Sequence, residues 1–328
     1  MTVSFAVPSL LLMGAAALGI LPPAVQAQVV GSDNFDSDSN AAWQADYIVG
    51  HGQLARTNGH LEYRVSSPDL INGDTAYRPW GLSQPTYSTD WEVLVDVHNT
   101  ATPSVVDQVA TFGIEVLNAN NLGDNAYVEI YASRLHVPSL RRGYKADLAL
   151  NGVELGENTL LGDTGNQGFT DGSVRMMFNS GTKVLTAWFD RDGSTNGYRW
   201  EKLASFGISG GGGGITTNAN WGMAGSDAFY VALYGYSQGM AVSSGEIDGD
   251  NFFIQTAGTD RPKLSVSPAT GGVQLRWPGA ALGYELEIST AIAPGSWTNA
   301  MQIPDIVNGT NVVKLPIDSQ ARFFRLRK

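Results

Sequence analysis

The chain of 328 residues contains no cysteine. This absence excludes disulfide bonds and thiol nucleophiles, so stability has to come from the core, with a bound metal as a further aid. Basic residues are also scarce, since 20 Lys and Arg stand against 31 Asp and Glu and the net charge is −11. The charge balance disfavours nucleic acid and anionic membrane surfaces as partners, and it leaves neutral polymers, cations and basic ligands open.

Charge is absent from the first 27 residues. This segment has an apolar run from Leu10 to Leu21 and ends in Val25-Gln26-Ala27, which suits signal peptidase cleavage before Gln28. We therefore predict a signal peptide over residues 1–27 and a secreted or cell-surface protein, with an uncleaved anchor as the alternative. Export without cysteine is typical of a bacterial protein. No later segment is long and apolar enough to span a bilayer, so we expect no membrane insertion after cleavage.

Helical periodicity is nearly absent from Val29 onwards. Instead, alternating apolar and polar segments are separated by Gly, Asn, Asp and Ser, and these segments are residues 90–98, 109–118, 125–133, 173–180, 182–190, 197–206, 228–237 and 249–256. They predict an all-β fold, with a large antiparallel jelly-roll β-sandwich over residues 28–256. A polar linker at 257–262 precedes five to seven short strands in 263–328, which predict a small second β-sandwich. Its expected aromatic core is Trp277, Tyr284, Trp297 and Phe324.

Two end motifs and the strand rhythm carry a family resemblance. Residues 32–256 open on "SDNFDSDSNAAW" and close on "GEIDGDNFFI", and they resemble a concanavalin A-like/laminin G-like jelly roll of bacterial secreted proteins. Residues 263–328, with "LRWP", "YELEIST" and a terminal "FFRLRK", resemble a fibronectin type III-like C-terminal module. The resemblance implies glycan binding or adhesion for the jelly roll, and a spacer or attachment role for the module.

The closing motif also resembles the active-site strand of laminarinase-like glucanases. On that comparison Glu246 is the nucleophile and Asp248 an auxiliary acid, and the acid/base position falls on Asp250 or on Asn251, which cannot donate a proton. Asp250 is one methylene shorter than the glutamate of that family, and the motif ends its domain instead of lying in the middle. We therefore expect a non-catalytic closing strand, and a retaining β-glucan hydrolase is the alternative.

Both ends of the predicted jelly roll are acidic. Asp33, Asp36 and Asp38 lie near its start and the closing motif near its finish, and the first and last strands of such folds are usually neighbours. Their carboxylates would repel unless they were paired or bridged. We predict a structural Ca²⁺ held by Asp33, Asp36, Asp248 and Asp250, which would connect the two ends without cysteine. Simple exposure of these side chains to water is the alternative.

Tyrosines recur at a spacing of two in the predicted strands. The ligand-binding candidates on these strands and on the turn-rich segment 74–87 are Tyr77, Trp80, Tyr127, Glu129, Tyr131, Tyr230, Tyr234 and Tyr236. Sugar rings have apolar CH faces that stack on flat side chains, and their hydroxyls need polar partners nearby. The alternative is ordinary packing on half-exposed strands or in the core.

Together these patterns predict a secreted, non-catalytic carbohydrate-binding or adhesion protein whose partner is a polysaccharide or a cell-surface glycan. A purely structural attachment role is also open. If the protein is an enzyme, the alternatives are the glucan hydrolase and a polysaccharide lyase on the concave face of the jelly roll. The lyase would use the basic segment from Arg134 to Lys145 to neutralise a uronate. A further acidic face, with Glu92, Asp96 and His98 beside Glu115, suits either acid/base chemistry or a solvated exterior.

Overall fold

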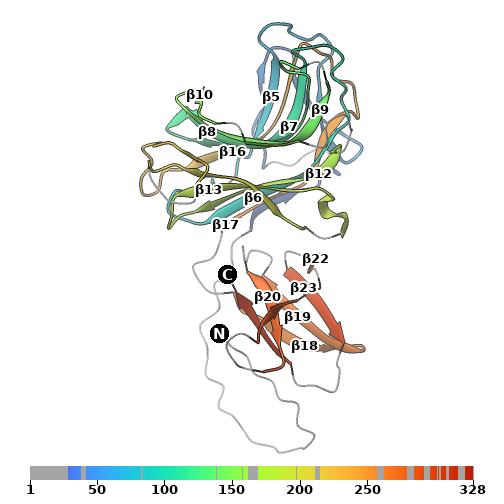
Figure 1. Ribbon diagram of the computed structural model, residues 1–328, viewed down its shortest axis with the longest axis vertical. Coiled ribbons are helices and arrows are strands. Elements are labelled where there is room, and N and C mark those ends of the chain that lie inside the picture. The colour runs from blue at the N-terminus through green and yellow to red at the C-terminus, as the bar shows by residue number, and fades with distance from the viewer. Residues whose placement is uncertain are drawn as a thin grey trace, which may run out of the picture. The chain divides into compact units, whose positions relative to one another are not determined.

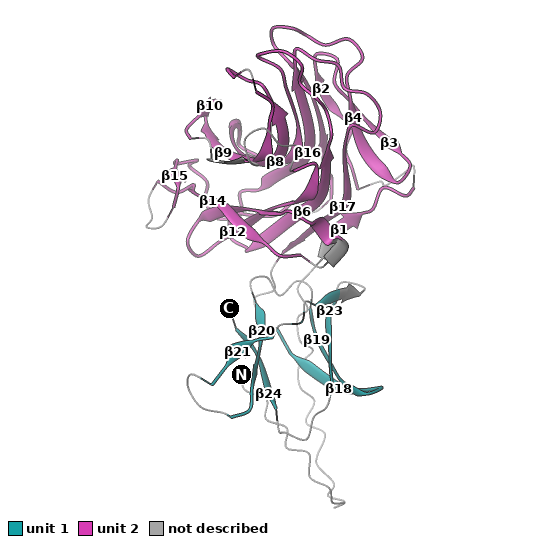
Figure 2. Cartoon of the chain, turned by 45° about the vertical axis from the view of Figure 1, so that its right-hand side comes forward, with its two compact units in different colours: residues 1–28, 257–328 teal, residues 29–256 magenta. Residues whose placement is uncertain are grey.

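The computed structural model is almost entirely β-structure, which confirms the predicted fold class. It describes residues 29–37, 42–82, 84–137, 139–156, 158–161, 169–196, 198–210, 215–256, 262–278, 284–291, 296–300, 302, 304–307, 310–316 and 322–327. The only helix in this part of the chain is a 3₁₀ turn at Gly193–Asn196. The chain separates into two compact units, one of Val29–Thr256 and one that includes Ala257–Lys328 (Figure 2). The predicted signal peptide and Asp38 lie outside the described residues.

Two antiparallel sheets pack face to face in the first unit (Figure 1). The nine-stranded sheet has the order β15 (Thr217–Asn218), β14 (Glu201–Gly207), β13 (Val184–Asp190), β12 (Asp171–Asn179), β6 (Trp91–Asn99), β17 (Ile247–Thr256), β4 (His60–Arg64) and β3 (Gln53–Thr57), and β1 (Val29–Asp33) pairs with β17. The short pair β14 and β15 is the parallel exception. The expected adjacency of the first and last strands is thus confirmed.

The second sheet of this unit has eight strands. Its order is β10 (Val153–Glu154), β9 (Arg141–Leu150), β8 (Asn121–Ser133), β7 (Val109–Asn118), β16 (Phe229–Gln238), β5 (Asp74–Pro79) and β2 (Tyr47–Val49), and β11 (Asn158–Leu161) pairs with β9. In Figure 1 the strands of this sheet bend upward, away from the nine-stranded sheet. Its outer face therefore lies on the inside of the bend.

Strand β9 corrects the prediction of a basic loop between Arg134 and Lys145. The segment from Arg141 is a strand, and Arg142 turns inward, with only 5% of its surface exposed. Its guanidinium donates to the carbonyl oxygens of Asn99, Thr100 and Ala101 at 2.6, 3.0 and 2.7 Å. Because these hydrogen bonds bury the charge, Arg142 is unavailable to an acidic ligand.

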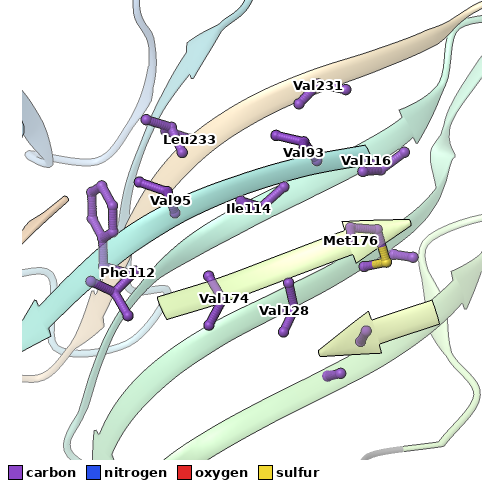
Figure 3. Close-up of a cluster of buried hydrophobic side chains, with 14 of the residues drawn as sticks. Val93, Val95, Phe112, Ile114, Val116, Val128, Val174, Met176, Val231 and Leu233 are labelled. Carbon is purple, nitrogen blue, oxygen red and sulfur yellow. The ribbon is translucent and has the colours of Figure 1, made fainter. Parts of the chain in front are cut away.

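The core between the sheets follows from the alternation of each strand. The inward residues are valine, isoleucine, leucine, phenylalanine and methionine side chains, and Figure 3 labels Val93, Val95, Phe112, Ile114, Val116, Val128, Val174, Met176, Val231 and Leu233 among them. All ten are fully buried, and burial of each such side chain stabilises the fold by about 1.5–3 kcal/mol. Since successive side chains point to opposite faces, the residues between them lie on the outer faces of the sandwich.

Trp80 belongs to this core. Only 1% of its surface is exposed, and its ring lies 5.0 Å from that of Trp43 and 5.2 Å from that of Phe252, measured between centroids. The prediction that Trp80 contacts a ligand from a rim loop is therefore wrong. The prediction assumed that a turn-rich segment is exposed. In the structure Trp80 directly follows β5 and packs under the paired strands β1 and β17.

The second unit has a four-stranded and a three-stranded sheet. The first has the order β18 (Ser265–Ala269), β19 (Gly272–Pro278), β23 (Thr310–Pro316) and β22 (Asp305–Val307), and the second β21 (Thr298–Asn299), β20 (Glu285–Ser289) and β24 (Phe323–Arg327). Trp277 and Phe324 lie in its core, as expected. Tyr284 and Trp297 are half-exposed instead, and the Arg325 guanidinium lies 4.2 Å from the centre of the Trp297 ring. In the described residues of the chain no helix is long and apolar enough to cross a membrane.

Candidate functional site

A continuous row of aromatic and charged residues, interrupted by one glycine, crosses the outer face of the eight-stranded sheet. The strand register places one residue from each of six strands side by side, namely Tyr47, Tyr77, Tyr234, Gly113, Glu129 and Lys145. We call this set the tyrosine row. It lies opposite the core-facing residues of the same strands, on the inside of the bend seen in Figure 1.

The aromatic rings of the row contact one another. Centroid distances are 6.0 Å between Tyr47 and Tyr77 and 5.9 Å between Tyr77 and Tyr234. Tyr127, two residues before Glu129 on β8, lies outside the row, and its ring is 6.2 Å from that of Tyr234. These values fall within the range of favourable aromatic pairs. Exposure decreases along the row, from 63% at Tyr47 to 6% at Tyr234. The row thus runs from an exposed edge strand to a covered polar centre.

A glycine lets the row cross strand β7. Gly113 lies between Tyr234 and Glu129, and the Tyr234 hydroxyl donates to the Glu129 carboxylate over it. A Cβ atom at position 113 would lie 2.1 Å from the Val128 carbonyl oxygen and 2.9 Å from the Glu129 Cβ. No other residue fits there without moving β8, so the hydrogen bond depends on this glycine.

Two carboxyl groups lie close together at the polar centre. Glu115 is opposite Tyr127 in the β7–β8 pairing and is therefore the diagonal neighbour of Glu129. Burial, together with the charge of Glu129, raises the pKa of Glu115 to about 8, although the Tyr77 hydroxyl acts in the other direction. Burial also raises the pKa of Glu129, against the lowering effects of Lys145 and Tyr234. At neutral pH Glu115 is therefore protonated.

The hydroxyl groups around this pair stay protonated as well. Burial raises the pKa of Tyr77, Tyr127 and Tyr234, and nearby carboxylates add to each rise. The Tyr127 hydroxyl donates to Glu154 at 3.0 Å, and the Lys145 amine lies 5.2 Å from the centre of the Tyr127 ring. The site is thus a set of neutral donors and flat rings around two glutamates.

The other predicted ligand residues share this face but not the row. Tyr230 is 38% exposed, and Tyr236 is half-buried with its hydroxyl donating to Gln238 at 2.8 Å. Tyr131 is 6% exposed, and in the β7–β8 pairing it lies opposite Thr111, outside the row. Of the predicted set, the structure brings Tyr77, Tyr127, Glu129 and Tyr234 together.

Sequence reasoning missed Tyr47 and Gly113, and it placed Glu115 beside Glu92, Asp96 and His98. In the structure Glu115 and those three residues lie on different sheets. Alternation with Phe112 and Ile114 does indicate the outward direction of Glu115. The short connection between β7 and β8 is a further signal, because it favours the pairing that brings Glu115 beside Glu129.

The predicted calcium ligands do not form a metal site. Asp33 is 7% exposed and forms an ion pair with Arg56, and it also accepts hydrogen bonds from the Trp43 indole and the Phe35 amide at 2.7 and 2.8 Å. Asp36 accepts a hydrogen bond from Asn34. Across the described ranges, no group of three or more His, Asp or Glu side chains could hold a metal ion. Arg56 supplies a positive charge beside Asp33, and a structural calcium ion stays a prediction.

The closing motif lies on the other outer face. Asp248 and Asp250 project from β17 of the nine-stranded sheet. Asp248 is 3.3 Å from His60, and Asp250 lies opposite Asp96 in the register of β17 and β6. Burial raises the pKa of both aspartates. Glu246 precedes the strand, and its carboxylate accepts from the Ser243 amide at 2.6 Å. The glucanase assignment of these three residues fails, because they do not lie on the inside of the bend, which is the outer face of the eight-stranded sheet.

Comparisons with known proteins give similarity at the level of solved structures. No protein-family model matches the chain, and no curated protein sequence matches it. The CBM2 module of the evolved Dit protein of Lactobacillus casei BL23 phage J-1 is similar with a TM-score of 0.44 and 9% identity, over 70% of this chain and 96% of that one. Lectin II from Ulex europaeus is similar with a TM-score of 0.42 and 9% identity, over 70% of this chain and 99% of the lectin. The carbohydrate recognition domain of Emp47p is similar with a TM-score of 0.41 and 9% identity, over 72% of this chain and 98% of that domain.

Proposed function

We propose that the first unit binds a neutral polysaccharide on the outer face of its eight-stranded sheet. The observation that carries this proposal is the tyrosine row, in which rings in mutual contact lead from an exposed edge to two glutamates. Sugars need flat apolar surfaces for their CH faces and polar partners for their hydroxyls. The row supplies both on a face that is turned away from the core.

The charges of the face favour a neutral ligand over an acidic one. Glu115, Glu129 and Glu154 surround the polar centre, and Lys145 is the only cation in the row. A uronate placed there would meet carboxylates at close range, which is unfavourable. Arg142 is committed to backbone carbonyl oxygens. The lyase alternative therefore lacks the cationic surface it requires.

We also propose, from the sequence, that the protein is exported and that its second unit is a spacer or attachment module, which would make it an adhesion protein. Mass spectrometry of the extracellular fraction of cells expressing the full gene tests export. Recovery of a mature chain starting at Gln28 is expected. A chain that keeps its first 27 residues in every fraction would contradict this part.

Affinity electrophoresis tests the binding proposal directly. Purified protein is run through gels containing laminarin, xyloglucan, xylan or mannan, and through gels containing alginate or pectate as acidic comparators. We expect at least one neutral polymer, and neither acidic one, to retard the protein. The change Tyr127→Ala should weaken that retardation, because it removes the ring between Tyr234 and Lys145.

The matched control is Tyr198→Ala, on the other sheet. Tyr198 stacks on Trp200 with centroids 4.9 Å apart and hydrogen-bonds Asp96, so the change removes a comparable ring far from the row. It should leave the retardation unchanged. The proposal is wrong if no neutral polymer retards the protein, or if both variants lose retardation to the same extent while remaining folded.

A further inference from the structure

We infer that Glu115 and Glu129 act as an acid and a nucleophile that hydrolyse the glycosidic bond of a polysaccharide bound at the tyrosine row. This inference rests on the proposed function and deepens it. It departs from the sequence-based expectation of a non-catalytic protein, and it uses different residues from those of the closing motif. The three arguments for it are the position of the pair on adjacent strands, the asymmetry of its surroundings, and its place at the end of the aromatic rings.

The spacing of the two glutamates suits a retaining mechanism. Glu115 and Glu129 are diagonal neighbours on adjacent antiparallel strands, an arrangement that puts Cβ atoms about 7 Å apart. Both side chains rise from the same face and the charge of one acts on the other. Retaining glycosidases hold their two carboxyl groups about 5–5.5 Å apart, whereas inverting enzymes need a wider gap for water. Two glutamates at this diagonal can bring their carboxyl groups to the shorter separation.

The surroundings of the two carboxyl groups differ in a way that separates their roles. Burial raises the pKa of Glu129, but the Tyr234 hydroxyl donates to it and Lys145 faces it from β9, and both of these contacts favour its carboxylate form. Glu115 has the Tyr77 hydroxyl beside it and the charge of Glu129 against it. Paired groups held in contrasting environments are how enzymes obtain one acid and one carboxylate at the same pH. Glu129 is therefore the nucleophile and Glu115 the acid.

The groups that face this pair come from every strand packed against it. They are Tyr77 from β5, Tyr234 and Tyr236 from β16, Thr111 from β7, Tyr127 from β8, Lys145 and Asp147 from β9, and Glu154 from β10. Thr111 is 2% exposed, and its hydroxyl lies beside Glu129, where it favours the carboxylate form.

The chemistry needs water as its only co-reactant. Glu115 gives its proton to the glycosidic oxygen while a Glu129 oxygen attacks the anomeric carbon. The bond to the departing sugar breaks, and its electron pair stays on the protonated oxygen. Water then attacks the anomeric carbon, its proton passes to Glu115, and the ester bond to Glu129 breaks. Both side chains return to their starting protonation states.

Hydrolysis of each neutral polysaccharide that retards the protein is the test. Reducing ends are measured after incubation with the full chain, and the anomer released first is identified by NMR. We expect release of reducing ends with retention of configuration. Glu129→Gln and Glu115→Gln should each lower kcat at least about 100-fold while the gel retardation persists. Glu201→Gln, in an exposed pair with Arg191 on the other sheet, is the control and should keep full activity.

The pH profile separates a catalytic role from a structural one. Activity should fall on the alkaline side as Glu115 loses its proton, with a midpoint near its pKa of about 8. If a retained polysaccharide releases no reducing ends from acidic to mildly alkaline pH, the inference is overturned while the binding proposal stands. If no neutral polysaccharide is retained at all, the binding proposal falls and the inference falls with it. Melting curves confirm that the glutamine variants are folded.

Discussion

The two outer faces of the jelly roll are both acidic, but they treat their carboxylates differently. On the nine-stranded sheet the buried Glu92 forms an ion pair with Arg175, and Asp96 accepts hydrogen bonds from Ser194 at 2.6 Å and Asn251 at 2.9 Å. On the eight-stranded sheet Glu115 and Glu129 lie under tyrosine rings, and no arginine is paired with either of them among the described residues. On the first sheet arginine and hydrogen-bond donors neutralise the carboxylates, whereas on the second tyrosine hydroxyls and the single cation Lys145 surround them. The second arrangement is the one to which the proposed ligand site belongs.

The largest expected effect comes from the paired face. Arg175→Met leaves the Glu92 carboxylate buried without its cation, and should lower the free energy of unfolding by about 3–5 kcal/mol. Urea denaturation at neutral pH measures it. Arg191→Met, which removes an exposed partner of Glu201 on the same sheet, should cost less than about 1 kcal/mol. Equal losses in the two variants would show that the buried ion pair stabilises the fold no more than the exposed one does.

Gly113→Ala should be next in size. The new Cβ meets the backbone carbonyl of Val128, which cannot turn away, and we expect a loss of about 2–3 kcal/mol in unfolding free energy. Polysaccharide retention should fall as well, because the Tyr234 to Glu129 hydrogen bond is displaced. Gly181→Ala is the control, since its nearest neighbour is the end of the Asn179 side chain at 3.3 Å. A fully stable Gly113→Ala protein that still binds would show that the row does not depend on this contact.

Glu115→Gln should change how stability depends on pH. The folded pKa of Glu115 is about 8, above its ordinary value of 4.5, so between these values the folded chain holds a proton that the unfolded chain releases. The stability of the native protein therefore falls as pH rises through this window. Glutamine removes that fall, so the variant should be more stable than the native protein above pH 8 and equally stable below pH 4.5. Parallel pH dependences in denaturation experiments would contradict the assignment.

Tyr47→Ala should have the smallest effect. The side chain is 63% exposed at the edge of the row, so its loss should leave the melting temperature unchanged and weaken polysaccharide retention only a few-fold, in line with about 0.5–1.5 kcal/mol for an aromatic contact. Val106→Ala, an exposed apolar residue outside the row, is the control. Retention that is identical in both variants would place the ligand away from the sheet edge.

The sequence carried the fold well because alternation is a local signal. Residues 109–118 form β7 with the predicted bounds, and the split of Tyr230, Tyr234 and Tyr236 from Phe229, Val231 and Leu233 follows from the strand period alone. The segment from Arg141 was misjudged because two arginines at the start of a strand resemble a solvated loop.

Sequence reasoning could identify only part of the candidate site. The tyrosines could be named, but their neighbours depend on which strands lie side by side. Glu115 and Glu129 meet because β7 and β8 are paired, whereas Tyr77 and Tyr234 meet because β5 lies beside β16, more than 150 residues later in the chain. Likewise, Asp33 was assigned to calcium because Arg56, 23 residues away, could not be recognised as its partner.

In the proposed function, the direction of the tyrosine row sets the size of the ligand. The row runs across six strands, from β2 to β9, and neighbouring strands are about 4.8 Å apart, so its span is about 24 Å. A single sugar ring covers only a fraction of that length and would contact one tyrosine at a time. Free monosaccharides should therefore compete poorly, and affinity should rise with each added sugar until the oligosaccharide reaches from the sheet edge to Lys145. At the edge strand β2 the row is open, so a longer chain can continue into solvent.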